Sequence, residues 1–180
     1  NFAASSPRYV AGPSLPYAAM HLCAANLPSG EVFVTGGGDH NAHPKLAAAL
    51  WRPGDRTWQS VASPTVPRLY HSECMVLPDG SVATFGSNQS PFFEKRVENY
   101  QPWYMHMPNR PTITRVPSTL SRGQRYNITY NAAHGATEAM LLRPSAVTHS
   151  SDPDQRAVNV RIRNTSNDTA RITIPSQPGI

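Results

Sequence analysis

The chain repeats itself at an interval of fifty residues. Six identical pairs stand at that spacing: His21 and His71, Leu27 and Leu77, Pro28 and Pro78, Gly30 and Gly80, Val32 and Val82, and Gly36 and Gly86. A period of about 50 residues is typical of kelch-type β-propeller blades, each of which is one small antiparallel sheet. Two unrelated hairpins that share a common turn are the alternative, and identities at one constant spacing argue against it.

Each copy of the repeat has the pattern of a β-hairpin. An apolar run enters a Pro-Ser-Gly or Pro-Asp-Gly turn, and a second run leaves it towards a glycine, over residues 22–36 and 74–86. Residues 48–58 predict two more short strands around a Pro-Gly-Asp turn. A propeller blade requires four strands, so we predict about two blades over residues 1–107. A propeller closes with four to eight blades, so we expect the rest of the propeller to come from sequence outside this chain.

The pattern changes after Met107. Residues 125–130, 158–163 and 171–174 alternate strictly between apolar and polar side chains, as half-buried strands do. We therefore predict an all-β chain, in which kelch-type blades over residues 1–107 precede an immunoglobulin-like β-sandwich over residues 108–180. Both parts look truncated, and the first residues show neither an initiator Met nor a targeting pattern, so we expect a piece of a longer protein.

The composition of the chain excludes several classes of structure and of binding partner. The chain has 18 Pro and 11 Gly, which exclude long helices and a membrane span. Its formal net charge is +5, but the arginines are spread from Arg8 to Arg171, so we expect a solvated face and no nucleic-acid partner. Two cysteines are too few for a disulfide framework, and we expect Cys23 and Cys74 to act as small buried hydrophobes in the hairpin strands.

Four Asn-x-Ser/Thr triplets bear on the compartment. They begin at Asn88, Asn127, Asn164 and Asn167, in a polar, β-rich context that suits glycosylation. We therefore expect a secreted, extracellular or cell-wall-associated protein.

Three side chains are candidate metal ligands: Tyr70, His71 and His149. Imidazole nitrogens together with a phenolate oxygen suit Cu(II) better than Mg, Ca or structural Zn. Adjacent residues of a strand point to opposite sides, so Tyr70 and His71 can share a metal only where the chain bends. His21 occupies the repeat position of His71, which leaves open that the repeat favours a structural histidine there.

Two motifs resemble those of the copper radical oxidases typified by galactose oxidase and glyoxal oxidase. Arg68-Leu-Tyr-His-Ser, followed by Leu77-Pro-Asp-Gly80, is similar to the last-blade motif of that family. Residues 142–150, followed by Asp154-Gln-Arg156, are similar to the segment of its C-terminal early-set domain whose histidine reaches into the propeller. Pro111-Thr-Ile-Thr is similar to the opening of that domain. The resemblance covers nearly the whole chain.

The resemblance implies a set of residue roles. His71 and His149 would be equatorial copper ligands, and Tyr70 would be the axial tyrosine. In that family, a Cu(II) centre and a protein radical each take one electron from a primary alcohol or aldehyde hydrate. The axial tyrosine accepts the substrate proton, and O₂ then reoxidises the site to give hydrogen peroxide. Arg143 and Arg156 lie in the second motif, and we expect both to be structural.

One element of the family pattern has no counterpart in these residues. The family's radical resides on a tyrosine crosslinked to a cysteine, and we expect that pair to come from missing upstream sequence. We therefore expect the isolated 180-residue chain to be inactive. The substrate stays open, since enzymes for different alcohols and aldehydes share these ligands.

Two other readings of the chain remain. One is a non-catalytic kelch and sandwich module that binds a glycan or a protein, with Trp51, Trp58 and Trp103 as sugar platforms. We expect Trp51 and Trp58 to pack in a core instead. The other reading is a Zn or Ca site at Asp39, His40 and His43, in a glycine-rich loop.

Overall fold

The computed structural model describes residues 5–6, 8–41, 43–90, 92–132, 135–148 and 152–177. Within these ranges the chain is built of strands, and the one helical element is a short 3₁₀ turn, η1 (Trp103–His106). None of the helical structure described is long and apolar enough to cross a membrane. The prediction of an all-β chain is confirmed.

The first sheet contains the four strands predicted for one repeat. They are antiparallel and lie in chain order, β1 (Cys23–Asn26), β2 (Val32–Thr35), β3 (Ala48–Trp51) and β4 (Gln59–Val61). The Pro-Ser-Gly turn closes the first hairpin, because the N–H of Gly30 donates to the carbonyl of Leu27 over 2.9 Å. That glycine has a φ of +79°, a backbone conformation that residues with a Cβ atom rarely adopt.

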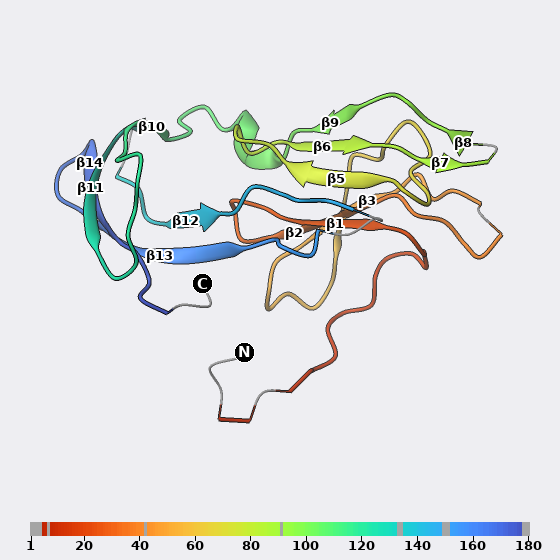
Figure 1. Ribbon diagram of the computed structural model, residues 1–180, viewed down its shortest axis with the longest axis horizontal. Helices are drawn as coiled ribbons and strands as arrows, with labels where there is room; N and C mark the ends of the chain where they lie inside the picture. Colours follow the sequence, from red (N-terminus) through yellow and green to blue (C-terminus); the bar gives the residue numbers. More distant parts are fainter. Residues whose placement is uncertain are drawn as a thin grey trace.

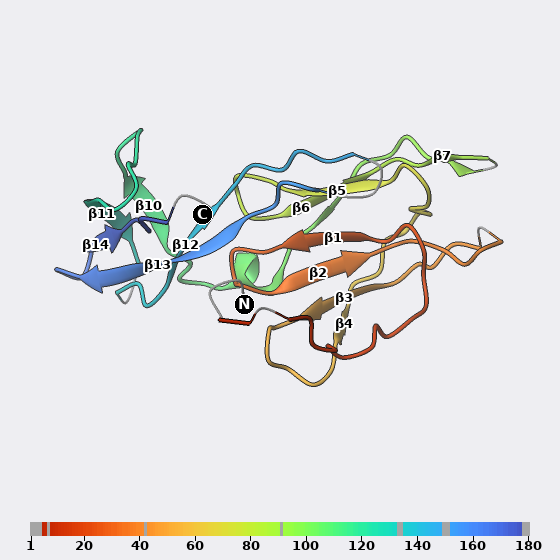
Figure 2. The same cartoon turned by 60° about the horizontal axis from the view of Figure 1, so that its bottom comes forward.

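The second sheet repeats the first hairpin. It consists of β5 (Glu73–Val76), β6 (Val82–Phe85) and β9 (Glu98–Tyr100), and a two-stranded ribbon of β7 (Asn88–Gln89) and β8 (Phe92–Phe93) extends beyond it. Strands β5 and β6 begin fifty residues after β1 and β2. The two sheets lie side by side, with β1 next to β5 (Figures 1 and 2). That these sheets are kelch blades, and that the first domain ends at residue 107, stay predictions.

An apolar core fills the space between these two sheets. Phe33 of β2 stacks on Tyr100 of β9 with ring centroids 4.5 Å apart. Leu27 and Val82 are fully buried in the same cluster. Burial of a large apolar side chain contributes about 1.5–3 kcal/mol, so contacts of this kind hold the two sheets in one unit.

The C-terminal part forms a five-stranded sheet. Its order is β10 (Thr112–Arg115), β11 (Arg125–Asn131), β14 (Thr169–Thr173), β13 (Ala157–Asn164) and β12 (Ala139–Leu142). The long β13 pairs with β12 through its first half and with β14 through its second half. The alternating apolar residues predicted from sequence line one face and form a core of Ile128, Tyr130, Val160, Ala170, Ile172 and Ile174.

The expected role of the two cysteines is wrong. Both are buried, as predicted, but Cys23 and Cys74 form a disulfide, with their Cα atoms 5.9 Å apart. They come together because β1 and β5 are neighbours in space, and the separation suits a disulfide. The bond joins the two copies of the repeat.

Removal of this disulfide should destabilise the fold. It closes a loop with a sequence separation of 51 residues, for which chain entropy predicts a stabilisation of roughly 4 kcal/mol. We expect the Cys23→Ala/Cys74→Ala double variant to lose about 2–4 kcal/mol in free energy of unfolding, measured by urea denaturation. Wild-type protein under reducing conditions should show the same loss. Equal stability of oxidised wild type and variant would contradict a structural disulfide.

Candidate metal centre

Tyr70 and His71 lie at a tight turn that leads into β5. The N–H of Ser72 donates to the carbonyl of Leu69 over 2.9 Å, which closes a four-residue turn across the two candidate ligands. His71 has a φ of +62°, as the third residue of a type II turn does. The chain thus bends at the point where the sequence required it to bend for both side chains to reach one metal.

Two glycines of the repeat pack directly against the backbone of this turn. Gly36 and Gly86 both have positive φ angles, of 71° and 82°. A Cβ on Gly36 would lie 2.6 Å from the Cβ of Arg68, and one on Gly86 would lie 2.4 Å from the carbonyl oxygen of His71. Both distances are shorter than van der Waals contact, so only glycine lets the strand ends approach the turn so closely.

Three aromatic rings gather at the turn. The rings of Tyr70 and His71 are stacked, with centroids 3.8 Å apart and planes 29° apart. His21, the repeat equivalent of His71, meets the Tyr70 ring edge-on at 5.1 Å. His21 also has a positive φ, of 58°, so the two histidines share a backbone conformation as well as a repeat position. The phenol ring is held between imidazoles from both copies of the repeat.

A hydrogen bond from β7 orients the His71 ring. The Nδ1 atom of His71 lies 2.7 Å from the amide oxygen of Asn88, which can only accept. Nδ1 therefore carries the proton, and Nε2 is the nitrogen with the lone pair that a metal requires. Histidine ligands in proteins are commonly held by such a bond from the other ring nitrogen. On sequence alone, Asn88 is identified only as the first residue of a glycosylation triplet. His21 is not assigned to the site.

A buried arginine anchors the start of the turn. The Arg68 side chain is 2% exposed, and its guanidinium lies 3.0 Å from a carboxylate oxygen of Glu98. It also donates to the carbonyl of Gly86, the glycine against which His71 packs. In addition, the carbonyl of Arg68 accepts the N–H of Gly37 over 2.6 Å. Arg68 thus ties the turn to both sheets.

The third candidate, His149, lies outside the described residues. Described residues before and after it make contacts that hold them in place. Gln155 exchanges two hydrogen bonds with the β1 backbone, at Ala24 and Asn26, each of 2.6 Å. Arg143 forms an ion pair of 2.8 Å with Asp154, and its N–H donates to the carbonyl of Arg156. Arg143 therefore has the structural role expected of it.

The other candidate sites from the sequence find less support. Asp39 uses its carboxylate to cap its own loop, with bonds to the N–H groups of Asn41 and His43 and to the His43 ring. Hydrogen bonds from His43 and Asn41 lower the pKa of Asp39 to about 2. Among the described residues, no three His, Cys, Asp or Glu side chains form a group that could hold a metal ion.

The three tryptophans proposed as sugar platforms lie in two different environments. Trp51 and Trp58 pack together with ring centroids 5.9 Å apart, and both indole N–H groups donate to backbone carbonyls. The two rings pack on each other, but both are half-buried and neither belongs to the core between the sheets, so the expected core packing is not observed. Trp103 is 46% exposed, and its N–H donates to Glu31.

Comparison with known proteins decides the family of the C-terminal part. A family model described as the galactose oxidase-like, early set domain matches residues 110–180. This part of the chain is a galactose oxidase-like early-set domain. The match confirms the expected immunoglobulin-like domain and the resemblance to galactose oxidase and glyoxal oxidase.

Full-length relatives extend the similarity beyond the early-set domain. An aldehyde oxidase, GLOX1, of Arabidopsis thaliana is 30% identical, with 78% of this chain and 28% of that protein covered. Galactose oxidase of Gibberella zeae is 28% identical, with 86% of this chain and 24% of that protein covered. The chain thus spans about a quarter of the length of these relatives.

A solved structure also shares the fold. It is described as a novel fungal alcohol oxidase with catalytic diversity among the AA5 family, in complex with copper. The TM-score is 0.80 at 22% sequence identity, and the match covers 91% of this chain and 37% of that one. The arrangement of blade-like sheets and early-set domain is therefore a known one.

The Arg68–Glu98 pair should make stability depend on pH. Partial burial raises the pKa of Glu98, but hydrogen bonds from Thr65 and Arg68 outweigh it and hold that pKa below its ordinary value of 4.5. A lowered pKa in the folded state gives stability that is present above pH 4.5 and is lost as the pH falls through the folded value. Thermal unfolding between pH 3 and pH 7, with about one pH unit between points, should show this decline.

A matched variant isolates the contribution of Glu98. Glu98→Gln should cost roughly 3 kcal/mol near pH 7, since it removes the charged partner that is bonded to the buried Arg68. The variant should also lose part of the decline at acid pH. Asp55→Asn, at an exposed carboxylate in the turn between β3 and β4, is the control and should change stability by at most about 1 kcal/mol. Equal effects of the two substitutions would show that the Arg68 pair does not anchor the turn.

Proposed function

We propose that this chain is part of a copper-dependent oxidase that converts a primary alcohol or aldehyde with O₂ to the aldehyde or carboxylic acid and hydrogen peroxide. In this proposal Tyr70, His71 and His149 hold the copper. The observation that carries it is the turn at residues 69–72, where a phenol and an imidazole with a fixed tautomer stand together. The division into blades over 1–107 and a sandwich over 108–180 is part of the same proposal.

The donor set fits the metal. Imidazole nitrogen and phenolate oxygen are ligands that suit Cu(II). The Asn88 bond leaves Nε2 of His71 as the metal-binding nitrogen, and this nitrogen is buried. Gln155, six residues after His149, bonds to β1 in the sheet next to β5, and this contact supports the assignment of His149 as the third ligand. When bound, copper supplies one-electron oxidising capacity and stabilises the phenolate form of a coordinated tyrosine.

Tyr70 is the proposed proton acceptor. Its side chain is 41% exposed, so a small alcohol can approach it. His71 covers one face of the phenol ring and His21 meets it edge-on, so both contacts favour the position that the ring has here. A neutral phenol already carries its proton, so Tyr70 accepts the hydroxyl proton of the substrate only in the phenolate state.

The radical cofactor implied by the resemblance needs a cysteine from outside these residues. The chain has two cysteines, and both are used in the disulfide. A Cys–Tyr crosslink must then be contributed by other parts of the protein. We accordingly expect residues 1–180 alone not to oxidise substrate.

The disulfide also supports the proposed location. Structural disulfides form and persist in oxidising compartments, and they are rare in the cytosol. Together with the four Asn-x-Ser/Thr triplets, the Cys23–Cys74 bond favours a secreted protein or one held in the cell wall. The relatives that match are an aldehyde oxidase and a galactose oxidase by name.

Substitution of the two histidines tests the proposed function. In the intact protein, His71→Ala and His149→Ala should each abolish copper-dependent peroxide production, measured by a peroxidase-coupled assay with a primary alcohol. Both variants should remain folded, with unchanged secondary structure by circular dichroism. His43→Ala is the control, since His43 is exposed and bonded to Asp39. Activity that persists in both ligand variants would rule out the assignment.

The Asn88 bond gives a second test, independent of turnover. Asn88→Leu removes the acceptor for Nδ1 and should weaken copper binding about 10- to 100-fold, measured by competition with a chelator. Asn88→Asp keeps an acceptor oxygen and should retain most of the affinity. Asn167→Leu, at an exposed triplet in the β13–β14 hairpin, should have no effect. Wild-type affinity of Asn88→Leu would show that the bond does not orient a ligand.

A further inference from the structure

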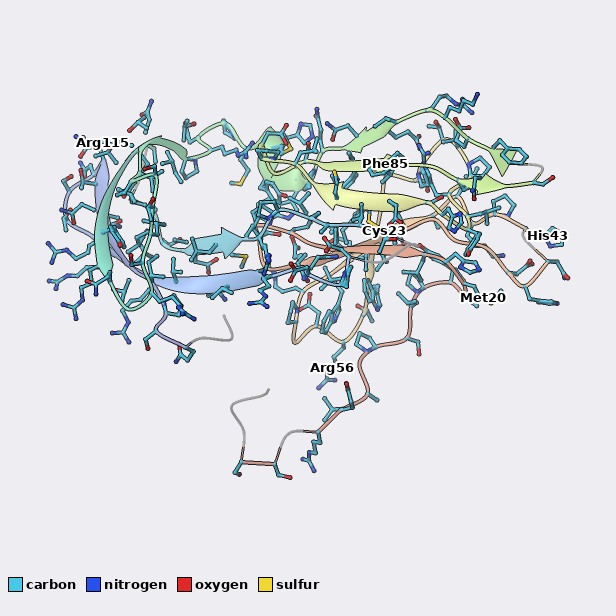
Figure 3. All side chains as sticks on the ribbon, in the orientation of Figure 1. Met20, Cys23, His43, Arg56, Phe85 and Arg115 are labelled. Atoms are coloured by element: carbon cyan, nitrogen blue, oxygen red, sulfur yellow. A yellow bond between two sulfur atoms is a disulfide. The ribbon has the colours of Figure 1, made fainter. Side chains whose placement is uncertain are left out.

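Four arginines gather on the outer face of the C-terminal sheet. Arg125 of β11, Arg171 of β14, and Arg161 and Arg163 of β13 are exposed, and we call them the arginine face. Register places them together: Arg171 is directly opposite Arg163, while Arg125 and Arg161 are both opposite Thr173. Nitrogen-tipped side chains project outward around this end of the molecule in Figure 3, with Arg115 labelled at its edge.

No outward position of β11, β13 or β14 on the arginine face holds an acidic side chain. The other outward positions on these strands are Asn127, Thr129, Asn131, Ala157, Asn159, Thr169 and Thr173. The carboxylate of Glu138, just before β12, lines a pocket together with Arg161. None of the four arginines forms an ion pair with a described residue, whereas Arg52, Arg68, Arg96 and Arg143 each do. The nearby carboxylate of Asp168 is engaged by Ser166 and Thr169. Like charges directly opposite across a sheet destabilise it, so this grouping carries a cost that a bound anion would remove.

The geometry suits a regular chain of anions. Adjacent strands lie about 5 Å apart, so the backbone positions of the four arginines fall close together on three neighbouring strands. Arginine is the side chain best suited to bidentate recognition of carboxylate and other oxyanions. The Nε of Arg171 donates to Asn127, which holds one guanidinium in place. The threonine hydroxyls between the arginines can bond to sugar hydroxyls.

We propose that the arginine face binds an acidic polysaccharide, one rich in uronate carboxylates. The disulfide favours an extracellular protein, and this location argues for a carbohydrate polyanion and against nucleic acid as the ligand. The outward positions of β11, β13 and β14 also hold no aromatic side chain on which a base could stack. Met20, next to His21 in the chain, lies at the opposite end of the molecule from Arg115 (Figure 3). A bound polymer would therefore leave the candidate metal centre open.

Binding of polygalacturonate to the intact protein tests this proposal without reference to copper. We expect a fluorescently labelled polygalacturonate oligomer to bind at low salt, as measured by fluorescence anisotropy. Its affinity should fall steeply as the salt concentration increases. Arg163→Gln/Arg171→Gln should weaken binding about tenfold, since each exposed ion pair accounts for a few-fold in affinity. The control, Arg8→Gln/Arg56→Gln, changes the net charge equally at two exposed arginines outside the C-terminal sheet and should bind as wild type.

Several results would overturn the proposal. No binding of the oligomer at low salt, or an equal loss in the two double variants, would mean that the arginine face is not a binding surface. Equal affinity for neutral galactan would show that charge does not select the ligand. If duplex DNA bound more tightly than the oligomer at the same concentration of negative charges, the arginine face would be assigned to nucleic acid instead. Circular dichroism of both double variants confirms that they are folded, so a loss of affinity reflects the surface.

Discussion

The contact on which the candidate centre depends is that of the buried Arg68 guanidinium with Glu98 and with the carbonyl of Gly86. A buried charge is costly unless it is paired, so this arginine fixes its partners where they lie. Gly86 in turn packs against the backbone of His71, and Gly36 packs against Arg68 itself. The position of the two ligand side chains is thus set by backbone and charge contacts beneath the turn.

The candidate centre is also a product of the repeat. One copy supplies Tyr70 and His71, and the other supplies His21 against the phenol ring. Both histidines have positive φ angles at equivalent positions. One copy thus provides proposed ligands, while the same position in its neighbour packs against one of them. The early-set domain adds a segment that is bonded to the first strand of the first copy.

The strands could be predicted because their signals are local. The Pro-Ser-Gly and Pro-Asp-Gly turns specify hairpins, and alternation specifies the half-buried strands. Contacts between distant segments could not be predicted in the same way. Two such contacts depend on β1 lying beside β5: the Cys23–Cys74 disulfide, and the edge-on contact between the rings of His21 and Tyr70. The role of Asn88 was hidden because its triplet also reads as a glycosylation signal. The arginine face was hidden because strand order joins residues that the sequence spreads over almost fifty positions.

The disulfide restricts how such a molecule can come apart. It joins the first strands of two neighbouring sheets, so these sheets cannot separate while the bond is intact. If one of the two sheets opens, its first strand stays tethered to the first strand of the other sheet. The opened sheet then remains within reach of its neighbour and can close against it again, because the tether limits how far the two can move apart.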